Sequence, residues 1–144
     1  MALSLLEEPG KTVLMMGNEA IARGAIEAGV QFATAYPGTP SSEVLAYLSR
    51  VSKQVDMYVE WSTNEKVAFE AAYAAALAGL RSIAVMKHLG THWILDPLAV
   101  AAITGVHGGL LVISADDPHP HSSQSSVDTR FHGRIVNIPV VEPS

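Results

Sequence analysis

The sequence predicts a three-layer α/β/α domain in which helices cover both faces of a mainly parallel sheet. Apolar runs alternate along the chain with helical repeats, which is the pattern of βαβ units. The apolar runs are continuous rather than alternating, as is typical of parallel strands that are buried on both faces. The length of 144 residues suits one compact domain, which we expect to span residues 1–144.

The first half of the chain contains two predicted helix–strand pairs. Asn18 is a suitable N-cap for the first helix, and Gly29 is a suitable stop. Pro37-Gly38 ends the strand that follows, because proline and glycine interrupt regular structure. The predicted elements are a helix over 18–29, a strand over 30–36, a helix that begins at Ser41 or Ser42 and a strand over 57–61.

The second half begins with an alanine-rich helix that Thr63 or Asn64 caps and Gly79 closes. Its small side chains allow other elements to approach its backbone closely. Pro97 lies inside a later helical pattern, where it should kink or restart the helix. The predicted elements are a helix over 63–77, a strand over 81–85, a helix over 91–103 and strands over 110–115 and 135–141.

Composition excludes several classes of site. The chain has no cysteine, so it has no disulfide, no thiolate nucleophile and no cysteine ligand for an iron–sulfur cluster. The net charge of −5, without a run of basic residues, argues against nucleic-acid binding. No apolar stretch has the length of a membrane span and the N-terminus does not resemble a signal peptide, which favours a cytoplasmic protein that does not bind membranes.

Common catalytic motifs are also missing. No Gly-x-Gly-x-x-Gly or Walker loop follows a strand, which argues against nicotinamide and ATP enzymes. No Gly-x-Ser-x-Gly elbow is present, which argues against a serine hydrolase. His119 and His121 lie near two aspartates, but a proline-rich loop is the better interpretation, and no metal site is expected there.

Glu65 is the leading candidate for a catalytic side chain. Ligands of parallel α/β folds bind beyond the carboxyl ends of the strands, and Glu65 follows a strand directly. A first-turn acid also stabilises its helix by about 0.3–1 kcal/mol through the helix dipole. Position alone leaves the catalytic and the structural interpretation open.

The order of several motifs resembles a known family. The pattern is similar to the N-terminal pyrimidine-binding domain of the alpha subunit of indolepyruvate:ferredoxin oxidoreductases, which belong to the 2-oxoacid:ferredoxin oxidoreductases. The resemblance covers about residues 17–142 and rests on these blocks: Gly17-Asn18-Glu19-Ala20, Tyr36-Pro37-Gly38-Thr39-Pro40, Asn64-Glu65-Lys66-Val67, Met86-Lys87-His88-Leu89-Gly90, Asp96-Pro97-Leu98, Gly105-Val106-His107-Gly108-Gly109 and Ala115-Asp116-Asp117-Pro118. The segment 91–95 departs from the family in being bulkier, which implies a pocket of different shape.

The resemblance implies a thiamine diphosphate-binding fold and a set of site residues. Glu65 would hydrogen-bond the ring nitrogen N1′ of the cofactor's aminopyrimidine. The cofactor-binding loop would comprise Tyr36, Pro37, Gly38 and Thr39, and Thr39 would also approach the substrate. Lys87 and His88 would be candidates for holding the substrate carboxylate. Gly109 stands where pyruvate-specific relatives carry an arginine, which would open space for an aryl side chain.

The resemblance also implies partners. The family's diphosphate-binding and ferredoxin-like domains are absent from the chain, so Mg²⁺ and [4Fe-4S] clusters would lie on other domains or subunits. A second oxidoreductase subunit, ferredoxin and coenzyme A would complete the oxidative decarboxylation of a 2-oxoacid to an acyl-CoA, and the domain would form a homodimer. Two alternatives stay open: the pyrimidine-binding subunit of a non-redox decarboxylase of the sulfopyruvate type, and a non-catalytic truncated binding or assembly module.

Overall fold

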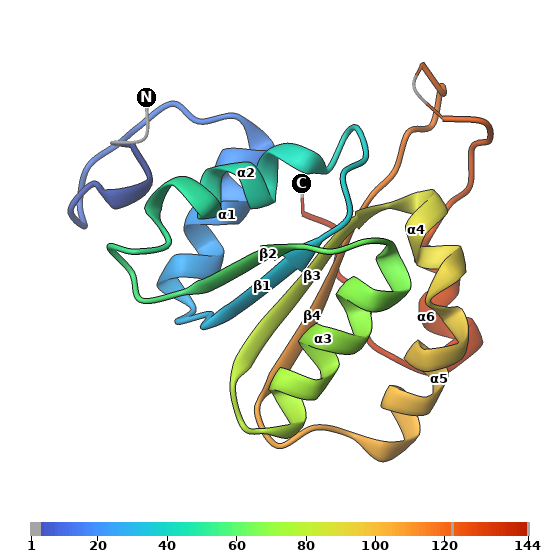
Figure 1. The fold of residues 1–144 in the computed structure, drawn as a ribbon. Coiled ribbons are helices and arrows are strands. Elements are labelled where there is room, and N and C mark those ends of the chain that lie inside the picture. The colour runs from blue at the N-terminus through green and yellow to red at the C-terminus, as the bar shows by residue number, and fades with distance from the viewer. Residues whose placement is uncertain (1–3, 122, 144) are drawn as a thin grey trace.

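The computed structural model describes residues 4–121 and 123–143 and has the predicted α/β class (Figure 1). A four-stranded sheet has the strand order β2-β1-β3-β4, and all three strand pairs are parallel. The elements in chain order are η1 (Ser4–Leu6), α1 (Gly17–Glu27), β1 (Phe32–Ala35), α2 (Ser42–Val51), β2 (Tyr58–Trp61), α3 (Glu65–Leu77), β3 (Arg81–Lys87), α4 (His88–Trp93), α5 (Leu95–Thr104), β4 (Gly109–Ala115) and α6 (Arg130–Val136).

Two apolar clusters explain why the strands read as continuous apolar runs. Ile83 and Val85 of β3 are buried on the face that α1 and α2 cover. Ala84 and Met86 of the same strand are buried on the opposite face, with residues of α3, α5 and α6. Successive side chains of a strand point to opposite faces. A strand that is buried on both sides therefore has mainly apolar residues at successive positions, as predicted, and the buried hydroxyl of Ser82 is hydrogen-bonded.

Helix α3 lies close to the sheet because most of its buried residues are alanines. The hydroxyl of Thr34 in β1 donates to the carbonyl oxygen of Ala68 at 2.8 Å. The hydroxyl of Ser82 in β3 donates to the carbonyl oxygen of Ala72 at 2.7 Å. Side-chain hydroxyls can reach a helix backbone only where no bulky side chain intervenes. The expected close approach of the alanine-rich helix is thus confirmed.

The structure divides the predicted helix over 91–103 into two. Helix α4 begins at His88, and α5 begins at Leu95 after a break at Ile94. Pro97 lies in the first turn of α5, where its missing N–H has no helical partner to lose. The predicted restart is confirmed, although it precedes the proline by two residues.

The predicted strand over 135–141 is wrong. Residues up to Val136 belong to α6, and Asn137 ends that helix with a left-handed conformation at φ 59°. The chain then turns back on the helix, where the amide of Ile138 donates to the carbonyl oxygen of Gly133 at 3.0 Å and Val140 packs onto Gly133. A short apolar run fits a strand or a packed helix end equally well, and Pro139 lacks the N–H that a sheet ladder requires.

Helix α6 packs with a histidine that should make stability depend on pH. His132 is 8% exposed, its ring centroid lies 5.0 Å from that of His92 on α4, and its Nδ1 has no hydrogen-bond partner among the described residues. Burial and the neighbouring His92 lower the pKa of His132, and Asp116 opposes this only in part. As the pH falls below about 6.5, the unfolded chain therefore binds more protons than the folded chain. The contribution of His132 to the free energy of unfolding is thus fully present above that pH and is lost as the pH falls.

We expect the free energy of unfolding to decrease between about pH 7.5 and about pH 5.5, and His132→Gln to reduce that decrease. Urea unfolding at both pH values measures the difference. His107 is exposed and makes His107→Gln the matched control, which should retain the full pH dependence. An undiminished pH dependence in His132→Gln would assign it to other groups.

Candidate functional site

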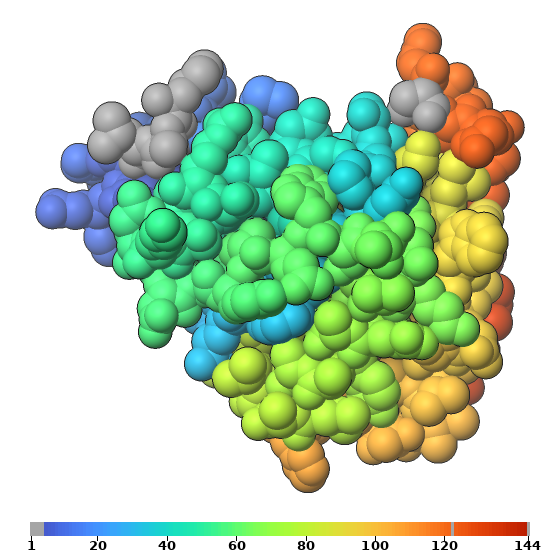
Figure 2. Space-filling model, viewed as in Figure 1, coloured from blue at the N-terminus to red at the C-terminus, as the bar shows by residue number. Residues whose placement is uncertain are grey.

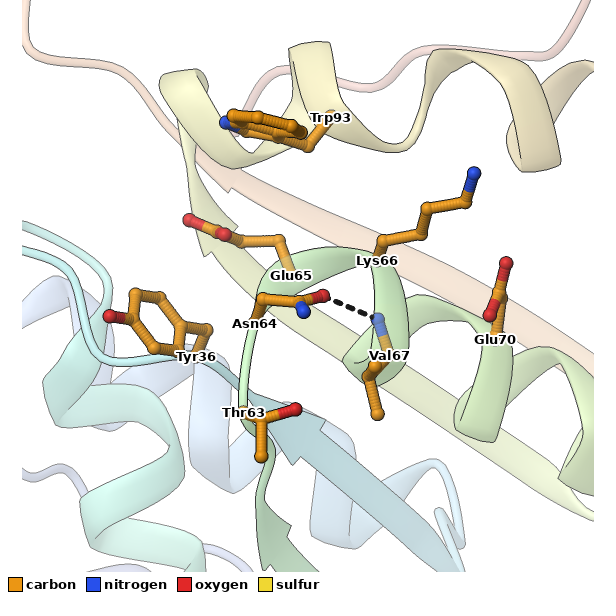
Figure 3. Close-up of a pocket in the computed structure, with 8 residues that line it drawn as sticks. All are labelled: Tyr36, Thr63, Asn64, Glu65, Lys66, Val67, Glu70 and Trp93. Carbon is orange, nitrogen blue, oxygen red and sulfur yellow. Dashed lines mark hydrogen bonds between the residues drawn. The ribbon is translucent and has the colours of Figure 1, made fainter.

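A pocket of about 440 Å³ opens at the carboxyl ends of β1 and β2 and beside α4. The segments around 36–40, 61–66 and 88–93, coloured cyan, green and yellow, meet on one face of the molecule (Figure 2). A volume of this size is typical of small-molecule sites. The lining residues are Tyr36, Thr63, Asn64, Glu65, Lys66, Val67, Glu70 and Trp93 (Figure 3).

The turn between β2 and α3 places Glu65 in this pocket. The amide of Ser62 donates to the carbonyl oxygen of Ala35 at 2.8 Å, which keeps the end of β2 beside the end of β1. Asn64 is extended, and its side chain accepts from the amide of Val67 at 2.9 Å, so it caps α3 as predicted. Glu65 is consequently the first residue of α3, and its side chain is half-buried.

Two aromatic rings flank the Glu65 carboxylate. Figure 3 shows this carboxylate turned toward the side of the pocket where Tyr36 and Trp93 lie, whereas Lys66 and Glu70 point away from it. Tyr36 is 40% exposed and Trp93 is 71% exposed, so both rings offer free surface to a ligand. Lys66 lies 3.6 Å from Asp96, an exposed ion pair that contributes little to stability. A carboxylate between aromatic rings can bind a flat ligand that carries a hydrogen-bonding nitrogen.

The predicted cofactor-binding loop is adjacent to the pocket but contributes only Tyr36 to its lining. The amide of Gly38 donates to Ser42 Oγ at 2.8 Å, and Ser41 Oγ donates to the carbonyl oxygen of Gly38 at 2.8 Å, so the start of α2 holds the loop. Pro37 and Thr39 are exposed on this loop. The roles of Pro37, Gly38 and Thr39 in binding stay predictions.

Lys87 and His88 connect the end of β3 with the long segment after β4. Lys87 Nζ donates to Ser123 Oγ at 3.2 Å. His88 is fully buried, and its Nε2 donates to the carbonyl oxygen of Ser125 at 2.8 Å. Neither residue lines the pocket that contains Glu65. Their predicted contact with a substrate carboxylate stays a prediction.

The histidine-containing loop has a structural partner in Asp116. The amide of Thr129 donates to Asp116 Oδ2 at 3.0 Å, and Thr129 Oγ1 donates to Oδ1 at 2.6 Å, which fixes the approach to α6. His119 and His121 are exposed. Over residues 4–121 and 123–143, no three histidine or acidic side chains are grouped so that they could hold a metal ion.

Sequence reasoning did not identify Trp93 as part of the site. The segment 91–95 was predicted to alter the shape of the pocket, but no residue within it was assigned a role. The position of Trp93 depends on where α4 ends, and the sequence predicts that helix with a different start and end. The available signal was its place shortly after a strand whose carboxyl end faces the predicted site.

Comparisons with known proteins show which sequences this chain resembles. A profile of the family described as "Pyruvate flavodoxin/ferredoxin oxidoreductase, thiamine diP-bdg" matches residues 23–91. "Indolepyruvate oxidoreductase subunit IorA" of Archaeoglobus fulgidus is 52% identical over 139 residues, which cover 94% of this chain and 22% of that protein. The protein of the same name from Pyrococcus horikoshii is 49% identical over 140 residues, which cover 97% of this chain and 22% of that protein. The chain thus spans about a fifth of the length of these relatives.

A solved structure confirms the fold. "2-oxoglutarate:ferredoxin oxidoreductase from Magnetococcus marinus with 2-oxoglutarate, coenzyme A and succinyl-CoA bound" matches with a TM-score of 0.68 at 24% sequence identity, over 78% of this chain and 20% of that chain. Among the residues that the structure describes, none of the helices combines the length and the apolar character needed to cross a bilayer. By the sequence matches, residues 23–91 carry the thiamine diphosphate-binding domain that is described for pyruvate flavodoxin/ferredoxin oxidoreductases.

Proposed function

We propose that the chain is the pyrimidine-binding domain of a thiamine diphosphate-dependent 2-oxoacid:ferredoxin oxidoreductase that acts on an aryl 2-oxoacid such as indolepyruvate. The observation that carries the proposal is the half-buried Glu65 carboxylate, which lies between Tyr36 and Trp93 in a pocket at the carboxyl ends of the strands. The high identity to indolepyruvate oxidoreductase subunits supports the substrate class.

The pocket suits the aminopyrimidine half of thiamine diphosphate. That ring is flat and carries a nitrogen that can share a proton with a carboxyl group, and the pocket offers one carboxylate and two aromatic side chains. The described residues offer no cluster of acidic side chains for Mg²⁺, and Lys66 is paired with Asp96. In keeping with the family resemblance, we assign the diphosphate and its Mg²⁺ to another domain.

Each side chain of the pocket has a distinct task in this proposal. Glu65 holds a proton at the ring nitrogen of the aminopyrimidine and accepts it back during turnover. Tyr36 and Trp93 orient the ring and exclude water from the carboxylate. Asn64 keeps Glu65 at the start of α3 through its bond to the amide of Val67. The bound cofactor supplies the electron sink for decarboxylation of the 2-oxoacid.

The remaining parts of the reaction lie outside this domain in the proposal. Iron–sulfur clusters need cysteine ligands, and the chain has none, so [4Fe-4S] clusters belong to ferredoxin-like domains or subunits. The relatives are named as subunits, which supports a second oxidoreductase chain as a partner. Coenzyme A, ferredoxin, a homodimer and a cytoplasmic location complete the proposal, with residues 1–144 as a single domain.

The proposal is tested by assaying the complete enzyme that contains this chain. We expect reduction of a low-potential acceptor that requires an aryl 2-oxoacid, coenzyme A and thiamine diphosphate, and slower reduction with pyruvate or 2-oxoglutarate. Release of CO₂ and aldehyde without acceptor reduction would instead identify a non-redox decarboxylase. Absence of turnover with every 2-oxoacid, together with absence of cofactor binding, would identify a non-catalytic binding or assembly module.

A further inference from the structure

The side chain of Glu65 lies directly against Gly90 of α4. A Cβ atom added at Gly90 would be 2.5 Å from Glu65 Cγ and 3.1 Å from Glu65 Cδ. It would also be 2.9 Å from Met86 Cβ. Non-bonded carbon atoms pack at about 3.5–4.0 Å, so only a hydrogen atom fits at this position.

The backbone does not explain a glycine here. Gly90 lies within α4 and, unlike Gly29, Gly79 and Gly105, does not have a positive φ. Glycine is less favourable than alanine inside a helix because it loses more conformational freedom on folding. The reason for glycine is therefore the close approach of the Glu65 side chain.

If a methyl group is added at Gly90, the 2.5 Å contact with Glu65 Cγ has to open furthest, and the 2.9 Å contact with Met86 Cβ has to open as well. Met86 is fully buried at the end of β3. The atom of Met86 in contact would be its Cβ, which cannot move without the backbone. Glu65 is half-buried at the edge of an open pocket and can rotate about its side-chain bonds. A larger residue at position 90 would thus displace the carboxylate that the proposed function uses.

We propose that Gly90 is a positioning residue that acts through Glu65. By admitting the Glu65 side chain against α4, Gly90 sets how far the carboxylate reaches toward the space between Tyr36 and Trp93. This inference rests on the proposed function, because it assigns Gly90 a role in the task of Glu65.

Gly90→Ala in the complete enzyme tests the inference. A displacement of about 1 Å in a catalytic group can cost about 10²-fold in rate, so we expect a loss of that order in kcat with a smaller change in the KM of the 2-oxoacid. Gly24→Ala is the matched control, because Gly24 also lies inside a helix and an added Cβ there meets no atom within 4 Å. This control should retain full kcat.

The Glu65→Gln background separates positioning from general damage. If Gly90 acts through Glu65, Gly90→Ala should change the residual kcat of Glu65→Gln by less than about twofold, since residues that act as a unit are not additive. An equal loss in both backgrounds would overturn the inference while leaving the proposed function intact. Full activity of Glu65→Gln alone would overturn the proposed function and, with it, the role of Gly90.

A measurement without turnover checks the contact itself. In the full chain, labelled with ¹³C and ¹⁵N, we expect a nuclear Overhauser effect between the Glu65 Hγ and the Gly90 Hα protons. Gly90→Ala should shift the carboxyl ¹³C resonance of Glu65, which Glu65→Gln identifies by its loss, and Gly24→Ala should leave it in place. Absence of the Overhauser effect, or an unshifted resonance in Gly90→Ala, would overturn the placement.

Discussion

Glu65→Gln is expected to lower kcat of the complete enzyme by about 10²- to 10⁴-fold, the usual contribution of a positioned acid–base group. Glutamine has nearly the same shape as glutamate, so it should occupy the same space between Tyr36 and Trp93. It cannot share a proton with a ring nitrogen, and that exchange is the task proposed for Glu65. Steady-state kinetics at saturating thiamine diphosphate measures the loss.

The fold should survive this substitution. Glu65 is half-buried and Asn64 caps α3, so the change removes only the favourable interaction with the helix dipole, which is worth about 0.3–1 kcal/mol. Glu43 is a first-turn acid in α2 that does not line the pocket, and a glutamine there can still accept from Asn18 Nδ2, so Glu43→Gln is a control for that effect. Unchanged kcat in Glu65→Gln, or an equal loss in Glu43→Gln, would remove Glu65 from the mechanism.

The parallel sheet could be predicted because both of its faces are buried. Each residue from Ser82 to Met86 is buried, which appears in the sequence as an unbroken run without charges. The position of Glu65 followed from the same logic. In a parallel sheet, the segments after β1 and β2 emerge at one edge, so the sequence predicts that Tyr36 and Glu65 lie near each other, and they line one pocket.

Other features depend on contacts between distant segments and could not be predicted. Ile138 and Val140 pack back onto α6, although their residue types fit a strand equally well. Gly90 belongs to a motif of the family, but the need for glycine at this position follows only from the Glu65 side chain that packs against it. The spacing of residues along the chain does not show which side chains of two different helices will be in contact.

Phe69→Ala should cause the largest loss of stability among the substitutions considered. Phe69 is fully buried on α3, in the cluster with Ala84 and Met86 of β3, and its ring stacks on Tyr73 with centroids 6.1 Å apart. Replacing a buried phenylalanine by alanine removes its transfer free energy and leaves a cavity, which together cost about 3–5 kcal/mol. Domains are commonly stable by only about 5–15 kcal/mol, so a large part of the stability would be lost.

Urea unfolding provides the measurement, with an unchanged slope as evidence that unfolding stays two-state. Leu77 lies on the same helix but is 39% exposed, so Leu77→Ala should cost less than about 1 kcal/mol. Equal losses in the two variants would place Phe69 outside the core.

The same variant separates folding from catalysis. Glu65 and Phe69 lie on one helix, but Asn64 and the hydroxyls of Thr34 and Ser82 fix the backbone of α3 independently of the phenylalanine ring. At a low temperature, where Phe69→Ala remains folded, kcat should therefore fall far less than in Glu65→Gln. A comparable fall in kcat in folded Phe69→Ala would mean that the packing of α3, rather than the capped turn before it, holds the carboxylate in place.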